Sequence, residues 1–138
     1  MAPSLHRVPD LLDREAFEAF VLALPAAVLV HQWGDASVAK VGGKIFAVLG
    51  GAVGGEGGGL SFKCADLAFE MLPELKGVAP APYLARAKWV AVAPGSDLSA
   101  AEIVAYVTEA HRIVAGKLTR RIRAELGLEA VTARRDRA

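Results

Sequence analysis

The sequence has a single cysteine, Cys64, among 138 residues. One cysteine cannot form an internal disulfide, and such scarcity is typical of proteins that work in a reducing compartment. A chain of this length can bury a core without disulfides or a structural metal. We therefore expect one globular domain in the cytoplasm.

Long hydrophobic runs are also missing, although 54% of the residues are hydrophobic. The longest run, residues 19–30, contains Pro25 and is shorter than the roughly 20 residues that a membrane-spanning helix needs. An acidic stretch, residues 10–18, precedes it, whereas a signal peptide begins with a positively charged region. We expect neither a membrane protein nor a targeting segment.

An excess of charge of one sign is absent from the chain as a whole, since the net charge is +1 and the pI is about 7.9. Dedicated DNA-binding domains usually have a pI above about 9. The distribution is uneven, because residues 112–138 hold eight basic and three acidic side chains, whereas residues 1–35 hold two and five. The basic end could contact a polyanion, or it could be a solvated helix face followed by a charged tail.

The clearest structural pattern is the pair Gly42-Gly43 between two β-prone runs in residues 38–49. A type I′ turn needs positive φ at both central residues, so the pair predicts a central antiparallel hairpin. Alternation along a two-residue hairpin predicts that one face is the core face and that Lys40 and Lys44 lie on opposite faces. The predicted core residues of this hairpin are Ala39, Val41, Phe46 and Val48.

Helical patterns lie on both sides of the hairpin. Asp10 or Asp13 can cap a first helix that Pro25 ends, and Ser99 with Glu102 forms a capping box for a long last helix that reaches Gly127. Between them we expect strands at residues 28–32, 60–64 and 88–92, a turn at 33–35, a helix capped by Asp66 and shortened by Pro73, and an extended connection at 78–82. This order predicts an α+β fold, an antiparallel sheet with helices packed on one face. Residues 10–128 would form the domain, with a flexible N-terminus at 1–9 and a flexible basic tail at 129–138.

Several segments, in this order, resemble the MmcQ/YjbR family of small bacterial proteins. They are Trp33-Gly34-Asp35, residues 40–47, residues 60–64, residues 80–84 and Lys88-Trp89-Val90. The resemblance covers residues 13–126 and implies a fold similar to frataxin (CyaY-like), with helices on a curved antiparallel sheet. It also implies the family's "double wing" DNA-binding label. The family has no agreed catalytic residues, so none is carried over.

Catalytic and metal-binding patterns are weak throughout. Cys64 could pair only with His31 or His111, and a lone cysteine that ends an apolar strand is usually a small buried hydrophobe. No spacing of histidines and cysteines in the sequence is suitable for a zinc site. The glycine-rich residues 50–59 lack a phosphate-loop pattern, so a flexible hairpin loop is favoured there. The frataxin-like fold raises iron binding by the acids of the first helix, but caps and a solvated face explain Asp10, Asp13, Glu15 and Glu18 better. We expect no cofactor, no metal and no enzymatic activity.

The hypothesis that remains is non-enzymatic DNA binding through basic strand ends and the last helix. The candidate contacts are Lys40, Lys44, Lys63, Tyr83, Arg86, Lys88, Arg112, Arg120, Arg121 and Arg123. Trp33 and Trp89 are expected in the core. The alternative is a protein- or small-ligand-binding adaptor that uses the exposed sheet face or a groove beside Tyr83 and Trp89. We expect a monomer or a weak dimer.

Overall fold

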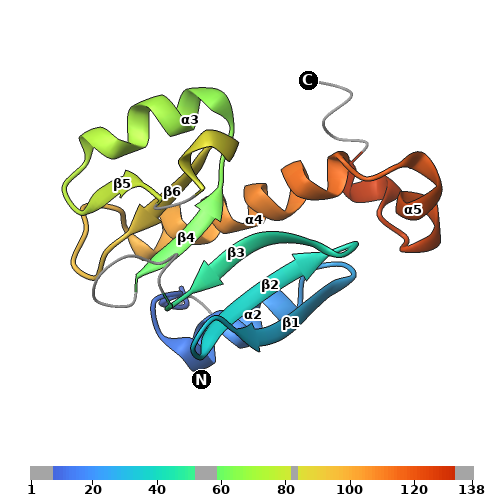
Figure 1. Ribbon diagram of the computed structural model, residues 1–138, viewed down its shortest axis with the longest axis horizontal. Helices are drawn as coiled ribbons and strands as arrows, with labels where there is room; N and C mark the ends of the chain where they lie inside the picture. The colour runs from blue at the N-terminus through green and yellow to red at the C-terminus, as the bar shows by residue number, and fades with distance from the viewer. Residues whose placement is uncertain (1–7, 52–58, 82–83, 133–138) are drawn as a thin grey trace.

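The computed structural model describes residues 8–51, 59–81 and 84–132. Its centre is a six-stranded antiparallel sheet with the strand order β1-β2-β3-β4-β6-β5 (Figure 1). The strands are β1 (Ala27–Gln32), β2 (Ala36–Val41), β3 (Lys44–Leu49), β4 (Leu60–Lys63), β5 (Val78–Pro80) and β6 (Trp89–Val92). The helices are α2 (Arg14–Leu22), α3 (Asp66–Met71), η1 (Leu72–Glu74), η2 (Ala85–Ala87), α4 (Ala100–Gly116) and α5 (Arg120–Glu125). The predicted α+β class is confirmed.

Two helices cover one face of the sheet. Asp13 caps α2 by accepting from the Ala16 amide, and Ser99 and Glu102 form the predicted capping box of α4. α2 packs on β1 and β2, and α4 packs on β3 and β4. The main core lies between these layers and includes the fully buried Phe17, Phe46 and Phe62.

The central hairpin forms as predicted, with φ of +59° at Gly42 and +82° at Gly43. Its predicted register was wrong beyond the turn. A β-bulge at Phe46 shifts the pairing, so that Ala39 faces Ala47 and Val38 faces Val48. Val48 therefore belongs to a second cluster on the other face of the sheet, and Ala47 takes its place in the main core. A period-two pattern cannot reveal an extra residue in one strand.

The predicted long last helix is interrupted. α4 ends at Gly116, and Thr119 caps the separate helix α5 by accepting from the Ile122 amide. The break lets Leu118 turn inward, where it is 5% exposed and lies against the hairpin turn at Gly42. Figure 1 shows that α5 projects beyond the sheet as a result.

Four smaller expectations need correction. Trp33 is 45% exposed, because it occupies a left-handed turn position (φ +56°) beyond the last β1–β2 pair. Ala65, without a side-chain hydrogen bond, stands at the N-cap of α3 in place of Asp66. Residues 78–80 pair with β6 as an edge strand, where a proline is tolerated. Residues 129–132 of the expected tail are helical, and Thr132 is 9% exposed.

Candidate nucleic-acid interface

A cleft opens where β3 and β4 stop pairing. Their last pair is Ala47 with Phe62, although β3 begins earlier, at Lys44, and β4 continues to Lys63. The bulge at Phe46 coincides with the end of this pairing. The carboxyl-terminal half of α4 forms the facing wall of a cleft of about 380 Å³. The lining residues are Lys63, Ala65, Asp66, Glu109, Arg112, Ile113 and Lys117.

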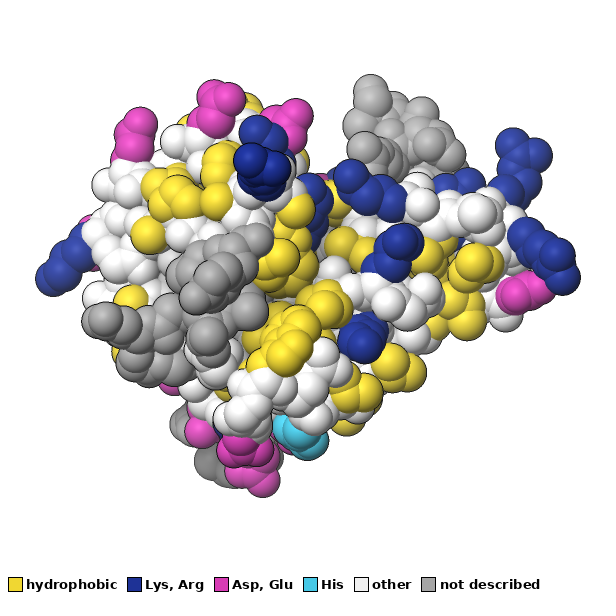
Figure 2. Space-filling view, in the orientation of Figure 1, with side chains coloured by type: hydrophobic (Ala, Val, Ile, Leu, Met, Phe, Trp, Pro, Cys, Tyr) yellow, Lys and Arg dark blue, Asp and Glu magenta, His cyan; other side chains and the backbone are white. Residues whose placement is uncertain are grey.

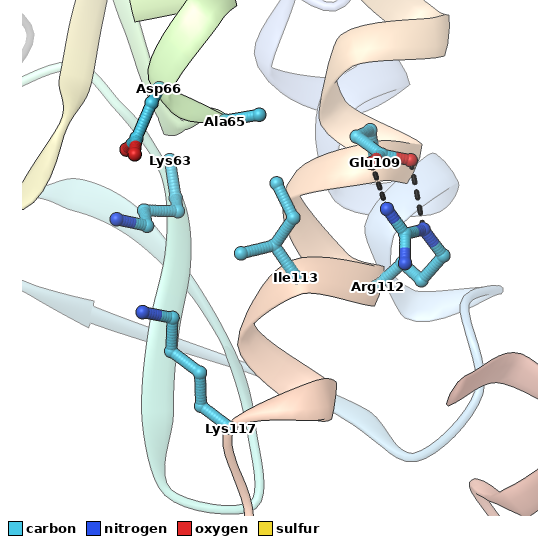
Figure 3. A pocket seen from close by; sticks show the side chains of 7 residues that line it. All are labelled: Lys63, Ala65, Asp66, Glu109, Arg112, Ile113 and Lys117. Carbon is cyan, nitrogen blue, oxygen red and sulfur yellow. Dashed lines mark hydrogen bonds and ion pairs between the residues drawn. The ribbon is translucent and has the colours of Figure 1, made fainter. Parts of the chain in front are cut away.

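Two lysines that are distant in the sequence meet at this cleft. Figure 3 shows the side chains of Lys63, from β4, and Lys117, which follows α4, extending to the same side of the cleft. Ile113 lies between them and Arg112. Ile113 is 6% exposed, so the middle of the cleft is formed by a packed apolar side chain. Lys63 and Lys117 therefore lie on one side of a packed apolar side chain, and Arg112 lies on the other side.

Lys63 is held in place by a hydrogen bond and lies near two other lysines and one acid. Its ammonium group donates a hydrogen bond to the carbonyl oxygen of Ala87. Burial lowers the pKa of Lys63 from its ordinary value, and the nearby charges of Lys117 and Lys88 act in the same direction, opposed by Asp66. An anion that entered the cleft would offset this mutual repulsion. The arrangement therefore favours a negatively charged ligand.

Lys88 is positioned by its backbone. Its φ of +66° is a left-handed conformation, and its carbonyl oxygen accepts from the Cys64 amide at 2.9 Å. Its ammonium nitrogen lies 5.1 Å from the centre of the Phe69 ring, a cation–π distance. These contacts place the cation beside β4, within electrostatic reach of Lys63.

Arg112 is shared between the cleft and its own helix. Its guanidinium donates two hydrogen bonds to the carboxylate of Glu109, which raises the pKa of Arg112 further. The third nitrogen, Nη1, is buried and has no hydrogen-bond partner among the described residues. Glu109 therefore neutralises part of the positive charge on this side of the cleft.

Further cations follow on α5. Arg123 donates to the Gly116 carbonyl at 3.0 Å and so ties α5 to the end of α4, whereas Arg121 pairs with Glu125 at 3.1 Å. Arg120 is exposed in the first turn. Figure 2 shows Lys and Arg side chains spread along the middle of this face, from the side of α3 to α5, with acidic side chains above and below them and one at the α5 end. We call the cleft together with α5 the basic face.

The structure brings together only some of the predicted contacts. Lys63, Lys88 and Arg112 lie in or beside the cleft, and Arg120 and Arg123 lie on α5. Lys40 and Lys44 flank the hairpin turn, and their pairing with Ile45 and Val41 puts them on opposite faces as predicted. Arg86 is exposed on η2, and Tyr83 lies outside the described residues.

Sequence reasoning missed Lys117. Residues 109, 113 and 117 are four apart, and this spacing places them on one side of a helix. That signal was available once Glu109 and Ile113 were assigned to the last helix. The missing knowledge was which side of the helix faces the end of β4.

The two tryptophans differ in environment. Trp89 is 5% exposed, as expected for a core residue, and it therefore cannot form the wall of an open groove. Trp33 is exposed but lies in the turn between β1 and β2, outside the cleft lining. The groove of the adaptor alternative also involves Tyr83, which lies outside the described residues.

The catalytic and metal alternatives gain no support from the described residues. Cys64 is 2% exposed, and burial raises the pKa of its thiol to about 11, which matches the predicted buried hydrophobe. His111 is buried and bonds the Pro25 carbonyl at 2.8 Å. Among residues 8–51, 59–81 and 84–132 there is no group of three or more His, Cys, Asp or Glu that could hold a metal. Most of the glycine-rich loop lies outside these ranges.

The acids of α2 have local roles. Asp13 is the helix cap, and Glu18 accepts hydrogen bonds from Ser37 and His31, both at 2.6 Å. These two bonds lower the pKa of Glu18. No described helix has the length and hydrophobicity needed to cross a bilayer.

Comparison with known proteins identifies the family. The YjbR family profile matches residues 22–113, which are 92 of the 138 residues. No curated protein matches the chain. A crystal structure of a protein from Pseudomonas syringae, a structural genomics target, superposes with a TM-score of 0.61 at 18% identity, over 74% of this chain and 98% of that one. At this identity the likeness concerns the fold alone. The profile match, across two thirds of the chain, shows that the protein belongs to the YjbR family.

Proposed function

We propose that this protein is a non-enzymatic module that binds nucleic acid in the cytoplasm, with DNA as its ligand. The basic face would contact phosphates of the backbone. The observation that carries the proposal is the meeting of Lys63 and Lys117 at one cleft, with Lys88 near enough to influence the charge of Lys63, since these residues come from three separate segments. Phosphate contacts by lysine and arginine supply most of the non-specific affinity of DNA-binding proteins.

The low net charge of the whole chain does not oppose this proposal, because a phosphate group is attracted or repelled mainly by the charges close to it. The screening length is about 8 Å at physiological ionic strength. Residues 112–125 carry five basic side chains and one acidic side chain, whereas three acids, Asp13, Glu15 and Glu18, lie at or in α2. The two groups belong to different parts of the fold. A polyanion at the basic face would therefore meet a positive local potential.

The non-enzymatic part of the proposal rests on the same site. The cleft lining offers ammonium, guanidinium and carboxylate groups but no cysteine, serine or histidine. The one thiol of the chain is buried, with its pKa raised to about 11. We therefore expect DNA to be recovered intact after incubation with the protein, which a labelled duplex on a denaturing gel would test.

Salt dependence is the direct test of phosphate binding. Four contacts, for example by Lys63, Lys88, Lys117 and Arg120, predict a slope of about −3.6 in a plot of log K against log[salt]. Affinity would then fall about 100-fold between 50 and 200 mM salt. Fluorescence anisotropy of a labelled duplex measures this slope. Absence of binding at low salt would refute the proposal.

A matched pair of charge reversals locates the site. Lys117→Glu changes an exposed cation of the cleft, and Lys76→Glu changes an exposed lysine between η1 and β5, outside the cleft lining. Both variants alter the net charge equally. We expect Lys117→Glu to weaken binding about tenfold or more and to reduce the salt slope by about 1, with little effect of Lys76→Glu. Equal losses in both variants would show that net charge, and not the basic face, governs binding.

A further inference from the structure

The two edge strands of the sheet differ in how well they are protected against pairing with another strand. A strand at the border of a sheet presents unpaired amide and carbonyl groups that can pair with another strand. β5 forms one border, has only three residues and ends in Pro80, which cannot donate a hydrogen bond. β1 forms the other border, has six residues and contains no proline and no lysine. Only β5 therefore carries the usual protection.

β1 is also a regular strand. It pairs with β2 at six consecutive positions, Ala27 with Val41 through Gln32 with Ala36, and shows no bulge. In the described part of the chain, β2 is the only strand beside it, and Figure 1 shows it as the border of the sheet. A long and regular border strand is a good template for a seventh strand.

Three exposed apolar side chains lie in β1 or near it in the sequence. Val28, in β1, is 51% exposed, and Leu22, at the end of α2, is 52% exposed. Trp33, directly after β1, is 45% exposed. These three belong to the seven large hydrophobic residues that are exposed among the described residues. Removal of Val28 from water would add to the backbone hydrogen bonds of a new strand pair.

We propose that β1 pairs antiparallel with β1 of a second copy of this chain, so that two six-stranded sheets become one continuous sheet. A second copy fits better than a foreign strand because β1 has no Asp, Glu, Lys or Arg that would select an oppositely charged partner. Its one titratable side chain, His31, already contacts Glu18 of the same chain. Two-fold pairing of identical surfaces is also the commonest form of self-association.

The symmetry of this pairing has a consequence for the basic face. Antiparallel pairing of two identical border strands requires a two-fold axis perpendicular to the sheet, so corresponding faces of both copies point to the same side. The two copies of the cleft would therefore lie on the same side of the dimer. The dimer would then present two basic faces to one nucleic acid and gain affinity by avidity. This consequence, unlike the pairing itself, rests on the proposed function.

The contact is small, so the dimer should be weak and reversible. It consists of one strand from each copy and the few side chains beside it, less than the roughly 800 Å² per partner of a standard interface. Sedimentation velocity from about 1 μM to 1 mM covers the range of such affinities. We expect the weight-average mass to rise from that of a monomer toward that of a dimer.

Two variants of equal charge test the surface. Val28→Glu introduces an acid opposite Lys40 of β2, a favourable pair within the monomer, but places two like charges in the dimer contact. Leu67→Glu changes a side chain on α3 that is 68% exposed and belongs to a different part of the fold. We expect Val28→Glu to stay monomeric and Leu67→Glu to associate like the wild type. Association of Val28→Glu at the wild-type level, or a monomeric wild type at 1 mM, would overturn the inference.

Hydrogen exchange of the wild type makes the test independent of any variant. Amides of residues 27–32 should gain protection as the concentration rises, whereas those of β5 should not change. Protection that appears elsewhere and not in β1 would also overturn the inference. No nucleic acid is present in these experiments, so their outcome is separate from that of the DNA-binding test.

Discussion

The hairpin turn offers a comparison of two adjacent glycines in which only one touches the rest of the protein. Gly42 and Gly43 both have positive φ, so alanine at either position meets a similar backbone penalty of about 1–2 kcal/mol. A Cβ on Gly42 would lie 2.5 Å from Cδ1 and 2.8 Å from Cδ2 of Leu118. A Cβ on Gly43 would have no atom within 4 Å. Of the two substitutions, only Gly42→Ala therefore creates a steric clash, with the side chain of Leu118.

The size of the difference follows from the burial of Leu118. Leu118 is 5% exposed, so a shift of its side chain would press on the buried residues around it. Excess volume in a packed site costs about 1–3 kcal/mol. We expect Gly42→Ala to lower the free energy of unfolding by that much more than Gly43→Ala, since the backbone penalty is common to both.

Urea denaturation followed by circular dichroism measures both variants against the wild type. In a Leu118→Ala background the collision is removed, and the two glycine substitutions should then cost the same. Leu118→Ala alone should cost about 2–5 kcal/mol, as for other buried leucines. Equal destabilisation by Gly42→Ala and Gly43→Ala in the wild-type background, within about 0.5 kcal/mol, would refute the packing of the hairpin on the α4–α5 junction.

Three further predictions concern other parts of the fold. Burial lowers the pKa of His111 below its ordinary 6.5, so the unfolded chain binds the proton more readily than the folded protein does. The free energy of unfolding should therefore fall as the pH drops below 6.5. His111→Gln, whose amide can still donate to the Pro25 carbonyl, should show a weaker pH dependence of the urea midpoint. Ser99→Ala should cost about 1 kcal/mol by removing the cap of α4, and a thermal melt with no shift would contradict the capping box. Cys64 in the native protein should react with a thiol reagent at pH 8 about 100-fold more slowly than in urea, because its pKa is raised to about 11; equal rates would show that the thiol is accessible.

Local chemistry was sufficient for the features that depend on a few neighbouring residues. The Gly42-Gly43 pair predicted a turn because positive φ is a property of those two residues, and both have it. Ser99 and Glu102 predicted a helix start because the capping box closes within four residues. Pro73 predicted the end of a helix, and α3 gives way to η1 at Leu72. The family, too, could be identified from the order of short segments.

Other features depend on contacts between distant segments. The bulge at Phe46 shifts the register of β3, and the α4–α5 break turns Leu118 toward the hairpin; neither has a strong local signal. The meeting of Lys63 and Lys117 required the position of α4 on the sheet, because the two residues are 54 positions apart in the chain. The sequence by itself thus determined the turns, the helix starts and the α+β class, whose causes lie within a few residues. The tertiary structure decided which cations share a cleft, since packing of the whole core sets the distance between segments.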